Sequence, residues 1–309
     1  MRRIALALTI FCAAGARADT NDLQLWRLGH PDSITVCTIC DGSDTQVQPG
    51  DATAQYRFAR LAATVALGFA PAFEDQAQTT GQSGFELGVS GQVLYPRLAP
   101  AEWPSEGTAG SAPVPQALLM PTIALRKGLG GSVEIGTAAS MMIGSQMVAL
   151  SGQLRWAIVE GIAGPDIALR AWGTHLLGDR EMDLWFGGAD VMVSKSFGVF
   201  GTTRLQPYAQ YGMVLVDATT SPINFNPGAA PSTTPSDNHG TFHRLAFWEN
   251  RYHRITAGVR IVRGVMLLGV EGGLAFGTNP VSHDPLSGAG PTEQFTRVWT
   301  TSARLGLAF

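Results

Sequence analysis

The dominant pattern along the chain is a strict alternation of apolar and polar residues. In the segment 84–95, Phe85, Leu87, Val89 and Val93 share one face, and the residues between them are mostly polar or glycine. Side chains of a β-strand point alternately to its two faces, so a period of two predicts a strand with one apolar face. The pattern recurs and predicts ten strands, at 84–95, 117–127, 131–142, 146–159, 166–177, 181–195, 203–216, 252–263, 265–276 and 295–309.

These strands are long for a soluble protein, in which about 5–6 residues is common. A strand that crosses a bilayer at a tilt needs about 9–11 residues, a length that the segments reach. Two segments depart from the pattern. Pro121 interrupts 117–127, and the segment 181–195 changes phase around Gly187 and Gly188, which predicts a bulge there.

The connections between the expected strands alternate between long and short. Long loops at 96–116, 217–250 and 277–294 follow odd-numbered strands, and every link after an even-numbered strand is short. Outer-membrane barrels have short periplasmic turns and longer external loops. The sequence therefore predicts an all-β fold, an antiparallel up-and-down transmembrane β-barrel of about ten strands over residues 84–309.

The last predicted strand carries a more specific signal. Trp299, Leu305, Leu307 and Phe309 lie at alternate positions, and the sequence ends on Phe309. This segment resembles the final strand of Gram-negative outer-membrane barrels, which commonly ends in phenylalanine after alternating apolar residues. The resemblance implies outer-membrane lipid as the surroundings and the barrel-assembly machinery as a partner that reads this strand. It implies no particular activity.

Composition narrows the alternatives. A soluble secreted β-sandwich also alternates, but its outer face would carry many lysines and glutamates, and Lys127 and Lys195 are the only lysines here. The net charge is −3 and no basic patch is evident, so we expect no nucleic-acid partner. No continuous apolar stretch of 18 residues follows the first segment, which excludes a helical membrane protein.

The N-terminal residues have the layout of a secretory signal peptide. Arg2 and Arg3 precede an apolar run, and Ala16-Arg17-Ala18 matches a cleavage pattern. We predict a signal peptide at 1–18 and a mature chain that begins at Asp19. A lipoprotein is the alternative because Cys12 lies near the apolar run, although the bulky Phe11 before it is unusual for one.

Residues 19–83 precede the barrel, and an alanine-rich stretch near 51–67 predicts a helix. This segment is either a plug inside the barrel, a periplasmic element packed under the barrel mouth, or an element at the membrane interface. We favour packing at the periplasmic mouth. Cys37 and Cys40 are expected to form a local disulfide in an oxidising periplasm. Redox or metal use is the alternative, and Asp41 and Asp44 oppose the low thiol pKa that redox use needs.

If the apolar faces meet lipid, the opposite faces carry charge into the barrel. One interpretation is a lining that selects a small solute, with the arginines favouring an anion. The other is a set of ion pairs that holds a narrow barrel shut, because barrels of about eight strands are filled by side chains. Inward glycines such as Gly88, Gly136, Gly269 and Gly273 leave a path possible. The expected interior charges are Glu86, Arg126, Glu134, Arg155, Arg170, Asp183, Arg254, Arg260, Glu271 and Arg304.

Histidines offer little further chemistry. His239 and His243 could bind a metal if they shared a helix, but the surrounding residues favour a loop, so no metal or cofactor is expected. His175 with Asp179 and Asp183 lies near an external rim, where a barrel hydrolase would keep its catalytic groups. No nucleophile motif accompanies them, so we expect no enzyme.

Three functional hypotheses remain. The first is a narrow channel or uptake barrel for small solutes. The second is a closed structural or adhesive barrel that presents the long external loops. The third, a hydrolase at the rim, has the least support.

Overall fold

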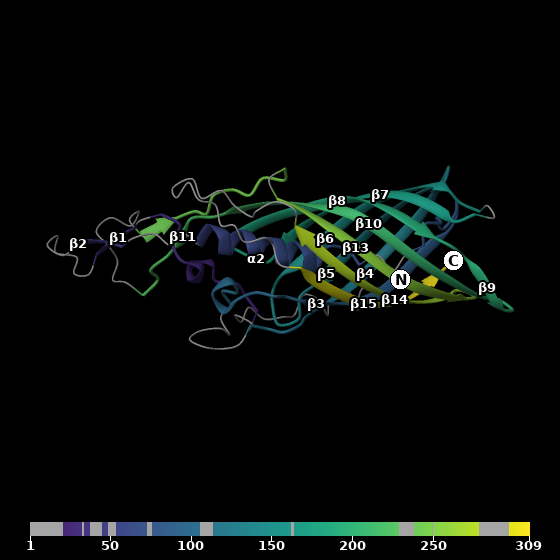
Figure 1. The fold of residues 1–309 in the computed structure, drawn as a ribbon, viewed down its shortest axis with the longest axis horizontal. Coiled ribbons are helices and arrows are strands. Elements are labelled where there is room, and N and C mark those ends of the chain that lie inside the picture. The colour runs from purple at the N-terminus through teal and green to yellow at the C-terminus, as the bar shows by residue number, and fades with distance from the viewer. Residues whose placement is uncertain are drawn as a thin grey trace, which may run out of the picture.

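Ten long antiparallel strands close into a barrel in the computed structural model (Figure 1). Each strand pairs with its neighbour along the chain, and the last strand pairs with the first, Trp299 lying opposite Tyr95. This confirms the predicted fold class. The structure describes residues 21–32, 34–37, 45–48, 54–72, 76–105, 114–161, 164–228, 238–248, 250–277 and 297–309, with the backbone alone at 34–37 and 45–48. The barrel strands are β3 (Phe85–Tyr95), β4 (Leu118–Gly130), β5 (Val133–Met141), β6 (Val148–Val159), β7 (Asp166–Leu177), β8 (Met182–Ser194), β10 (Thr203–Thr220), β13 (Arg251–Arg263), β14 (Met266–Gly277) and β15 (Val298–Ala308).

The two ends of the barrel differ. The described parts of loops 96–117 and 221–250 lie at one end, which we call the long-loop end, together with the links 142–147 and 178–181. The first loop contains η3 (Pro100–Glu102), and the second contains β11 (Ile223–Asn224) and β12 (His239–Gly240). The links 131–132, 160–165 and 264–265 lie at the opposite, short-turn end, where β9 (Phe197–Phe200) pairs with the start of β10. The loop predicted at 277–294 lies almost entirely outside the described residues.

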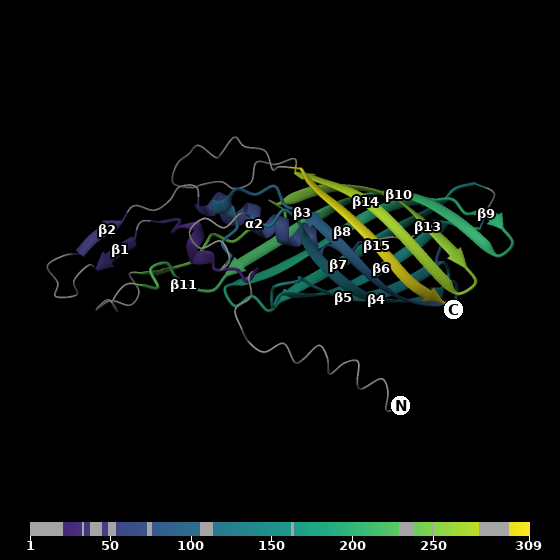
Figure 2. The same cartoon turned by 90° about the horizontal axis from the view of Figure 1, so that it is seen from below.

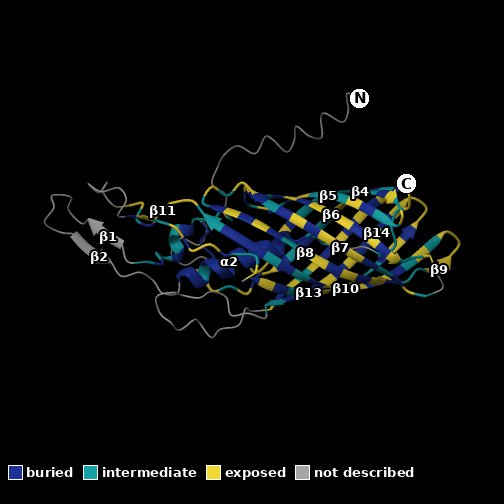
Figure 3. Ribbon diagram, turned by 90° about the horizontal axis from the view of Figure 1, so that it is seen from above, coloured by how far each residue is buried: buried dark blue, intermediate teal, exposed yellow. Residues whose placement is uncertain are grey.

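The outer face of the barrel is apolar between its two rims. Residues along the barrel strands largely alternate between exposed and buried (Figure 3). Large hydrophobic side chains are among the exposed ones, which is the arrangement of a barrel surrounded by lipid. No described helix is long and apolar enough to span a membrane. Exposed outward residues include Leu87, Val89, Ile123, Ile135, Leu154, Leu169, Val191, Ile255, Leu268, Val270 and Leu305, and the aromatic residues Trp156, Trp185, Tyr211 and Trp299.

The predicted bulge in β8 is wrong. Its register with β7 and β10 runs without a shift, and Gly187 and Gly188 keep their places in the alternation. The apparent change of phase has another cause: the inward Leu184 and Phe186 are apolar because they belong to the hydrophobic core at the long-loop end. Register shifts occur instead between β4 and β5 and between β6 and β7. Pro121 is tolerated in β4 because the ladder with β5 begins only at Thr122.

The N-terminal segment enters the barrel from the long-loop end. It contains η2 (Leu25–Leu28), a hairpin of β1 (Ile34–Cys37) and β2 (Thr45–Gln48), and the helix α2 (Ala54–Phe69). The hairpin and α2 lie at the end opposite the C-terminus (Figures 1 and 2). After α2 the chain must reach the short-turn end, where β3 begins, and it does so through the inside of the barrel. We call the described residues 70–72 and 76–84 the lumen segment.

The sequence favoured packing under the periplasmic mouth, and the structure places α2 at the end that carries the long loops. The reason is that α2 is apolar on nearly all sides, which suits a helix enclosed by protein. Every residue of α2 except Arg57 is buried. The helix packs with Leu94, Met120 and Val214 of the barrel wall and with Trp103 of a loop. The predicted signal peptide at 1–18 and Cys40 lie outside the described residues, and of Cys37 only the backbone is described.

Candidate functional site: an occupied lumen

The lumen segment is held by hydrogen bonds to the barrel wall. The guanidinium of Arg155 donates to the carbonyl of Gln76 at 2.8 Å, and the backbone N–H of Ala77 donates to the Ser194 hydroxyl at 2.8 Å. Nearer the helix, Arg254 donates to the carbonyl of Pro71 at 3.3 Å. A buried backbone group without a partner is costly, so wall side chains of this kind are what an extended segment inside a barrel requires.

Glu134 joins the lumen segment to the charged wall. One carboxylate oxygen accepts from the backbone N–H of Thr80 at 2.9 Å, and the other accepts a short hydrogen bond from Arg155. Arg126 lies 3.8 Å from the same oxygen. Glu134 is 1% exposed, so its charge is stabilised by these partners rather than by water.

A second cluster is centred on Glu86, which has no exposed surface. Arg126 and Arg304 bind one carboxylate oxygen, Arg304 at 2.7 Å. Arg260 binds the other oxygen at 3.0 Å. Three guanidinium groups on three strands therefore converge on one carboxylate, and they tie β3, β4, β13 and β15 together across the lumen.

A third cluster surrounds Asp190 on β8. Arg170 donates to Asp190 at 2.8 Å, and the indole N–H of Trp172 donates to the same oxygen at 2.8 Å. Arg254 lies over the Trp172 ring at 5.6 Å and is 3.8 Å from the other oxygen of Asp190. Glu271, buried on β14, accepts from the Tyr208 hydroxyl at 3.1 Å. Interior charges are thus shared among several partners.

The predicted interior charges are all buried inside the barrel except Asp183. Its side chain is 60% exposed on the outer face, where it lies 2.9 Å from His175. The expectation was wrong because the inferred bulge shifted the phase of β8. With regular alternation the inward acid is Asp190, which the sequence analysis missed. Its pairing with Arg170, directly opposite on β7, could have indicated it.

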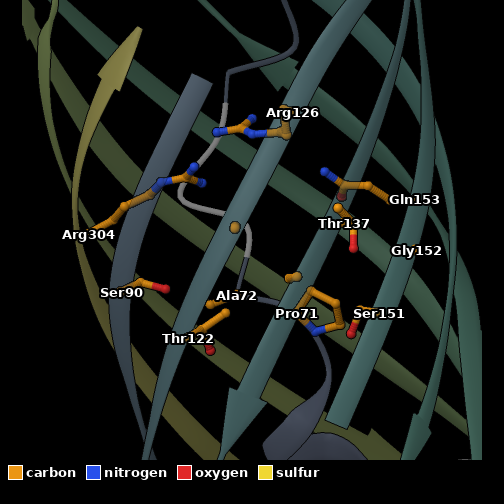
Figure 4. A pocket seen from close by; sticks show the side chains of 12 residues that line it. Pro71, Ala72, Ser90, Thr122, Arg126, Thr137, Ser151, Gly152, Gln153 and Arg304 are labelled. Atoms are coloured by element: carbon orange, nitrogen blue, oxygen red, sulfur yellow. The ribbon is translucent and has the colours of Figure 1, made fainter. Parts of the chain in front are cut away.

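Two cavities lie beside the lumen segment in the described part of the barrel, and the larger one, of about 270 Å³, is at the short-turn end between Gln76–Thr80 and the wall residues Gln206 and Arg260. The smaller one, of about 30 Å³, lies nearer α2, between Pro71 and Ala72 on one side and Arg126 and Arg304 on the other (Figure 4). A water molecule needs roughly 10–15 Å³ measured in the same way, so the smaller cavity has room for about two. Ser90, Thr122, Ser151 and Gln153 also line it, which makes it polar.

The inward glycines make room for side chains instead of leaving a path. A Cβ atom at Gly88 would lie 2.4 Å from Nε of Arg304. One at Gly136 would lie 2.5 Å from Nε2 of Gln153, and one at Gly273 would lie 2.6 Å from Oγ1 of Thr300. The small residues on the inner faces therefore accompany a filled interior at these positions.

The long-loop mouth is closed around α2 by loop residues. Phe58 stacks on Phe242 with 4.7 Å between ring centroids. The amide of Gln55 exchanges two hydrogen bonds with the backbone of His243, both 2.9 Å long. On the other side, Arg60 pairs with Glu102 at 3.0 Å. Loops 96–105 and 238–248 thus clamp the helix from two sides.

Of the three rim groups proposed for hydrolysis, the structure brings His175 and Asp183 together, 2.9 Å apart, and Asp179 binds elsewhere. His175 and Asp183 face outward on the barrel wall, and the imidazole stacks on Trp185 with 4.0 Å between centroids. Asp179 instead caps the link to β8 by accepting from the backbone N–H groups of Glu181 and Met182. Burial raises the pKa of Asp179 to about 6, and the neighbouring Glu181 and Asp22 contribute, while the two hydrogen bonds oppose the shift.

Comparison with known proteins finds distant structural similarity to solved structures. No protein-family model matches the chain, and no curated protein matches its sequence. It resembles the N-terminal β-barrel domain of Pseudomonas aeruginosa OprF, with 13% identity and a TM-score of 0.29 over 74% of this chain and 99% of that one. It also resembles LpxR from Salmonella typhimurium, with 9% identity and a TM-score of 0.36 over 73% of this chain and 99% of that one. A third similar structure is Ail, the attachment invasion locus protein of Yersinia pestis, with 8% identity and a TM-score of 0.27 over 74% of this chain and 99% of that one.

At these values the similarity carries no argument about activity. The architecture stands on the chain's own geometry: a closed barrel of antiparallel strands, an even number of them, and an apolar outer face between two rims. This combination is that of outer-membrane barrels. The chain is an outer-membrane β-barrel protein.

Proposed function

We propose that the protein is a closed display barrel, which anchors its N-terminal segment and long loops on the external side of the outer membrane. Of the roles that the sequence leaves open, this is the closed structural or adhesive barrel. The observation that carries the proposal is the path of the chain through the lumen. The segment that links the barrel to residues 21–69 occupies the space that a solute would use.

The direction of the path supports the same role. Long loops of outer-membrane barrels are external, and residues 21–32 pack at the long-loop end, where the N–H of Asn21 donates to the carbonyl of Gly144 at 2.7 Å. The segment before the barrel is then external, joined to β3 through the barrel. Surface loops and termini positioned by a rigid scaffold are common places for recognition.

The polar contacts of the lumen segment distinguish this role from a channel. A channel for a small solute needs a continuous path, whereas Gln76, Ala77 and Thr80 are bonded directly to the wall. The arginines then serve as fixed partners of the segment and of Glu86, Glu134 and Asp190. A solute would have to displace these contacts before it passed.

Ion conductance across a planar bilayer tests whether the barrel is closed. We expect folded full-length protein to give no steady conductance. The comparison is a variant that lacks residues 19–83, which keeps every barrel strand and removes the lumen segment, and we expect it to conduct. Steady conductance of the unaltered protein would overturn the proposal in favour of a channel or uptake barrel.

Epitope tags test the external placement of the N-terminal segment. One tag is inserted between β1 and β2, and a matched control tag is inserted at Gly131 and Ser132, in the turn between β4 and β5. We expect antibody to stain intact cells that carry the first tag, and to stain those that carry the second only after permeabilisation. The opposite pattern would contradict the proposed orientation.

A further inference from the structure

We propose that the outer surface of the long-loop rim over β13, β14, β15 and β3 binds the phosphate-bearing headgroup of a membrane lipid. We call this surface the rim patch. It goes beyond the display role and does not depend on it, since it lies on the outside of the barrel. The rim patch consists of Tyr95, Arg97, Arg251, His253, Arg297 and Trp299.

Two exposed arginines, Arg97 and Arg297, lie just beyond the ends of β3 and β15, the pair of strands that closes the barrel. Tyr95 and Trp299 are direct register partners on β3 and β15, and both rings are exposed. Arg97 and Arg297 each lie two residues beyond this pair, on the same outward phase, and both are exposed. Residues opposite each other on neighbouring antiparallel strands are about 4.5–5.5 Å apart, so the two cations extend from adjacent strand ends.

The neighbouring strands add a cation and an anchored imidazole. Arg251 and His253 share the outward phase of β13, and Arg251 is exposed. His253 stacks on Phe276 of β14 at 5.6 Å and on Tyr211 of β10 at 5.8 Å. Its Nδ1 is 2.6 Å from the Tyr211 hydroxyl. These contacts fix the ring on the outer wall at β13, which β14 separates from β15.

The charge of the rim patch is not balanced by the part of the chain that the structure describes. No ion pair with a described carboxylate involves Arg97, Arg251 or Arg297. Two other arginines near the same end do have such partners: Arg244 lies 2.6 Å from Asp217, and Arg60 lies 3.0 Å from Glu102. Like charges on adjacent strands repel each other, and an anion between them relieves that repulsion. The planar guanidinium matches two oxygens of a phosphate.

The surroundings of the patch identify the phosphate as part of a lipid. From the patch toward the short-turn end, the outward face of the barrel is apolar. Ile255, Leu305 and Val89 are exposed there on β13, β15 and β3. Tyr95 and Trp299 lie between the arginines and this apolar surface, at the level where aromatic girdles meet lipid headgroups. Acyl chains therefore have a surface beneath the headgroup that a free phosphate would not use. Basic residues at a membrane surface attract anionic lipids by charge.

Native mass spectrometry of the full-length protein in nonionic detergent micelles tests the proposal. The probes are phosphatidic acid and phosphatidylcholine with identical acyl chains. We expect phosphatidic acid to bind more tightly. We expect the double variant Arg97→Gln with Arg297→Gln to bind phosphatidic acid about tenfold more weakly, the loss of roughly one charge-assisted hydrogen bond.

The matched control is Arg204→Gln with Arg263→Gln. Both arginines are exposed at the short-turn end, Arg263 on the outward phase of β13 and Arg204 at the inner rim of β10, so the control removes the same charge away from the rim patch. We expect this control to bind phosphatidic acid within about twofold of the unaltered protein, and both variants to keep the heat-modifiable migration of a folded barrel. Equal weakening in the two variants, equal affinity for the two lipids, or displacement of the lipid by equimolar inorganic phosphate would each overturn the proposal.

Discussion

Glu134 on β5 accepts a hydrogen bond from the backbone N–H of Thr80, 2.9 Å away, so the barrel wall binds the segment that passes through it. The two residues are 54 positions apart in the chain. The same carboxylate is bound by Arg155, which in turn donates to the carbonyl of Gln76. Wall and lumen segment thus share one hydrogen-bonded network, and the stability of the barrel depends in part on what fills it.

Replacing Glu134 by glutamine tests this network. An amide oxygen still accepts from Thr80, but the charge that balances Arg155 and Arg126 is lost. Removing one partner of a buried ion pair costs about 3–5 kcal/mol, because the other charge stays buried. We expect a decrease of this size in the free energy of unfolding, measured by urea titration in detergent micelles.

Asp183→Asn is the matched control for Glu134→Gln. It also removes a carboxylate from an ion pair, but Asp183 is 60% exposed and its partner His175 is on the outer face. Exposed pairs contribute about 0–1 kcal/mol. If the two substitutions lowered the free energy of unfolding equally, the interior network would contribute no more to stability than an exposed ion pair.

Strand positions could be predicted from the sequence because alternation is a local property. In β3, for example, the outward Leu87 and Val89 face lipid while Glu86 faces the lumen, and this contrast repeats on every strand. Every strand of the barrel has lipid on its outer side and the barrel interior on its inner side. A period of two therefore predicted the strands and, outside β8, the side that the charged residues face.

The contents of the lumen could not be predicted in this way. Whether α2 packs inside or outside the barrel depends on contacts such as Gln55 with His243, which are 188 positions apart. Long-range contacts also explain why the sequence analysis placed Asp183, rather than Asp190, inside the barrel. Leu184 and Phe186 look like lipid-facing residues unless the hydrophobic core at the long-loop end is known to lie against them. The inner face of the barrel contacts the hydrophobic core at one end and the polar lumen segment at the other. Its residues are therefore apolar at one end and polar at the other.

The contact between Gly128 and the lumen segment gives a second prediction. A Cβ atom at Gly128 would lie 1.8 Å from the carbonyl oxygen of Gly81, a backbone atom that cannot turn away. Overpacking of this kind costs about 1–3 kcal/mol. We expect Gly128→Ala to lower the free energy of unfolding by that amount or more in the same urea titration.

Gly152→Ala controls for the general effect of alanine in a strand. Gly152 is exposed on β6, and nothing lies within 4 Å of the position that a Cβ atom would take. We expect unchanged or slightly higher stability, because glycine in a strand is unfavourable by roughly 0.5–1 kcal/mol relative to alanine. Equal losses at the two positions would indicate that Gly128 is not in contact with the lumen segment.

The link between β7 and β8 should make stability depend on pH. Burial raises the pKa of Asp179 from 3.8 to about 6, so the folded state binds the proton more tightly than the unfolded state. The stabilisation is therefore complete below pH 3.8 and is lost as the pH rises through about 6. Burial also raises the pKa of Glu181, which acts in the same direction.

Asp179→Asn separates this effect from the other titrating groups. Asparagine keeps the oxygen that accepts from Glu181 and Met182 but does not ionise. We expect the stability of the unaltered protein to rise relative to the variant as the pH falls from 7 to 4, in urea titrations at each pH. A difference that is constant with pH would show that Asp179 titrates near its ordinary value.

Two parts of the chain fill the barrel: α2 at the long-loop mouth and the lumen segment beyond it. Phe58→Ala tests which of them keeps ions out. Phe58 is buried in α2 and stacks on Phe242, so truncation should cost about 3–5 kcal/mol. The control Phe197→Ala removes a ring that is 49% exposed in β9 and should change stability little. We expect both variants to remain silent in planar bilayers, because the lumen segment keeps its bonds to Arg155, Ser194 and Glu134. Conductance in Phe58→Ala alone would mean that the helix is the seal and that the segment below it leaves a path for ions.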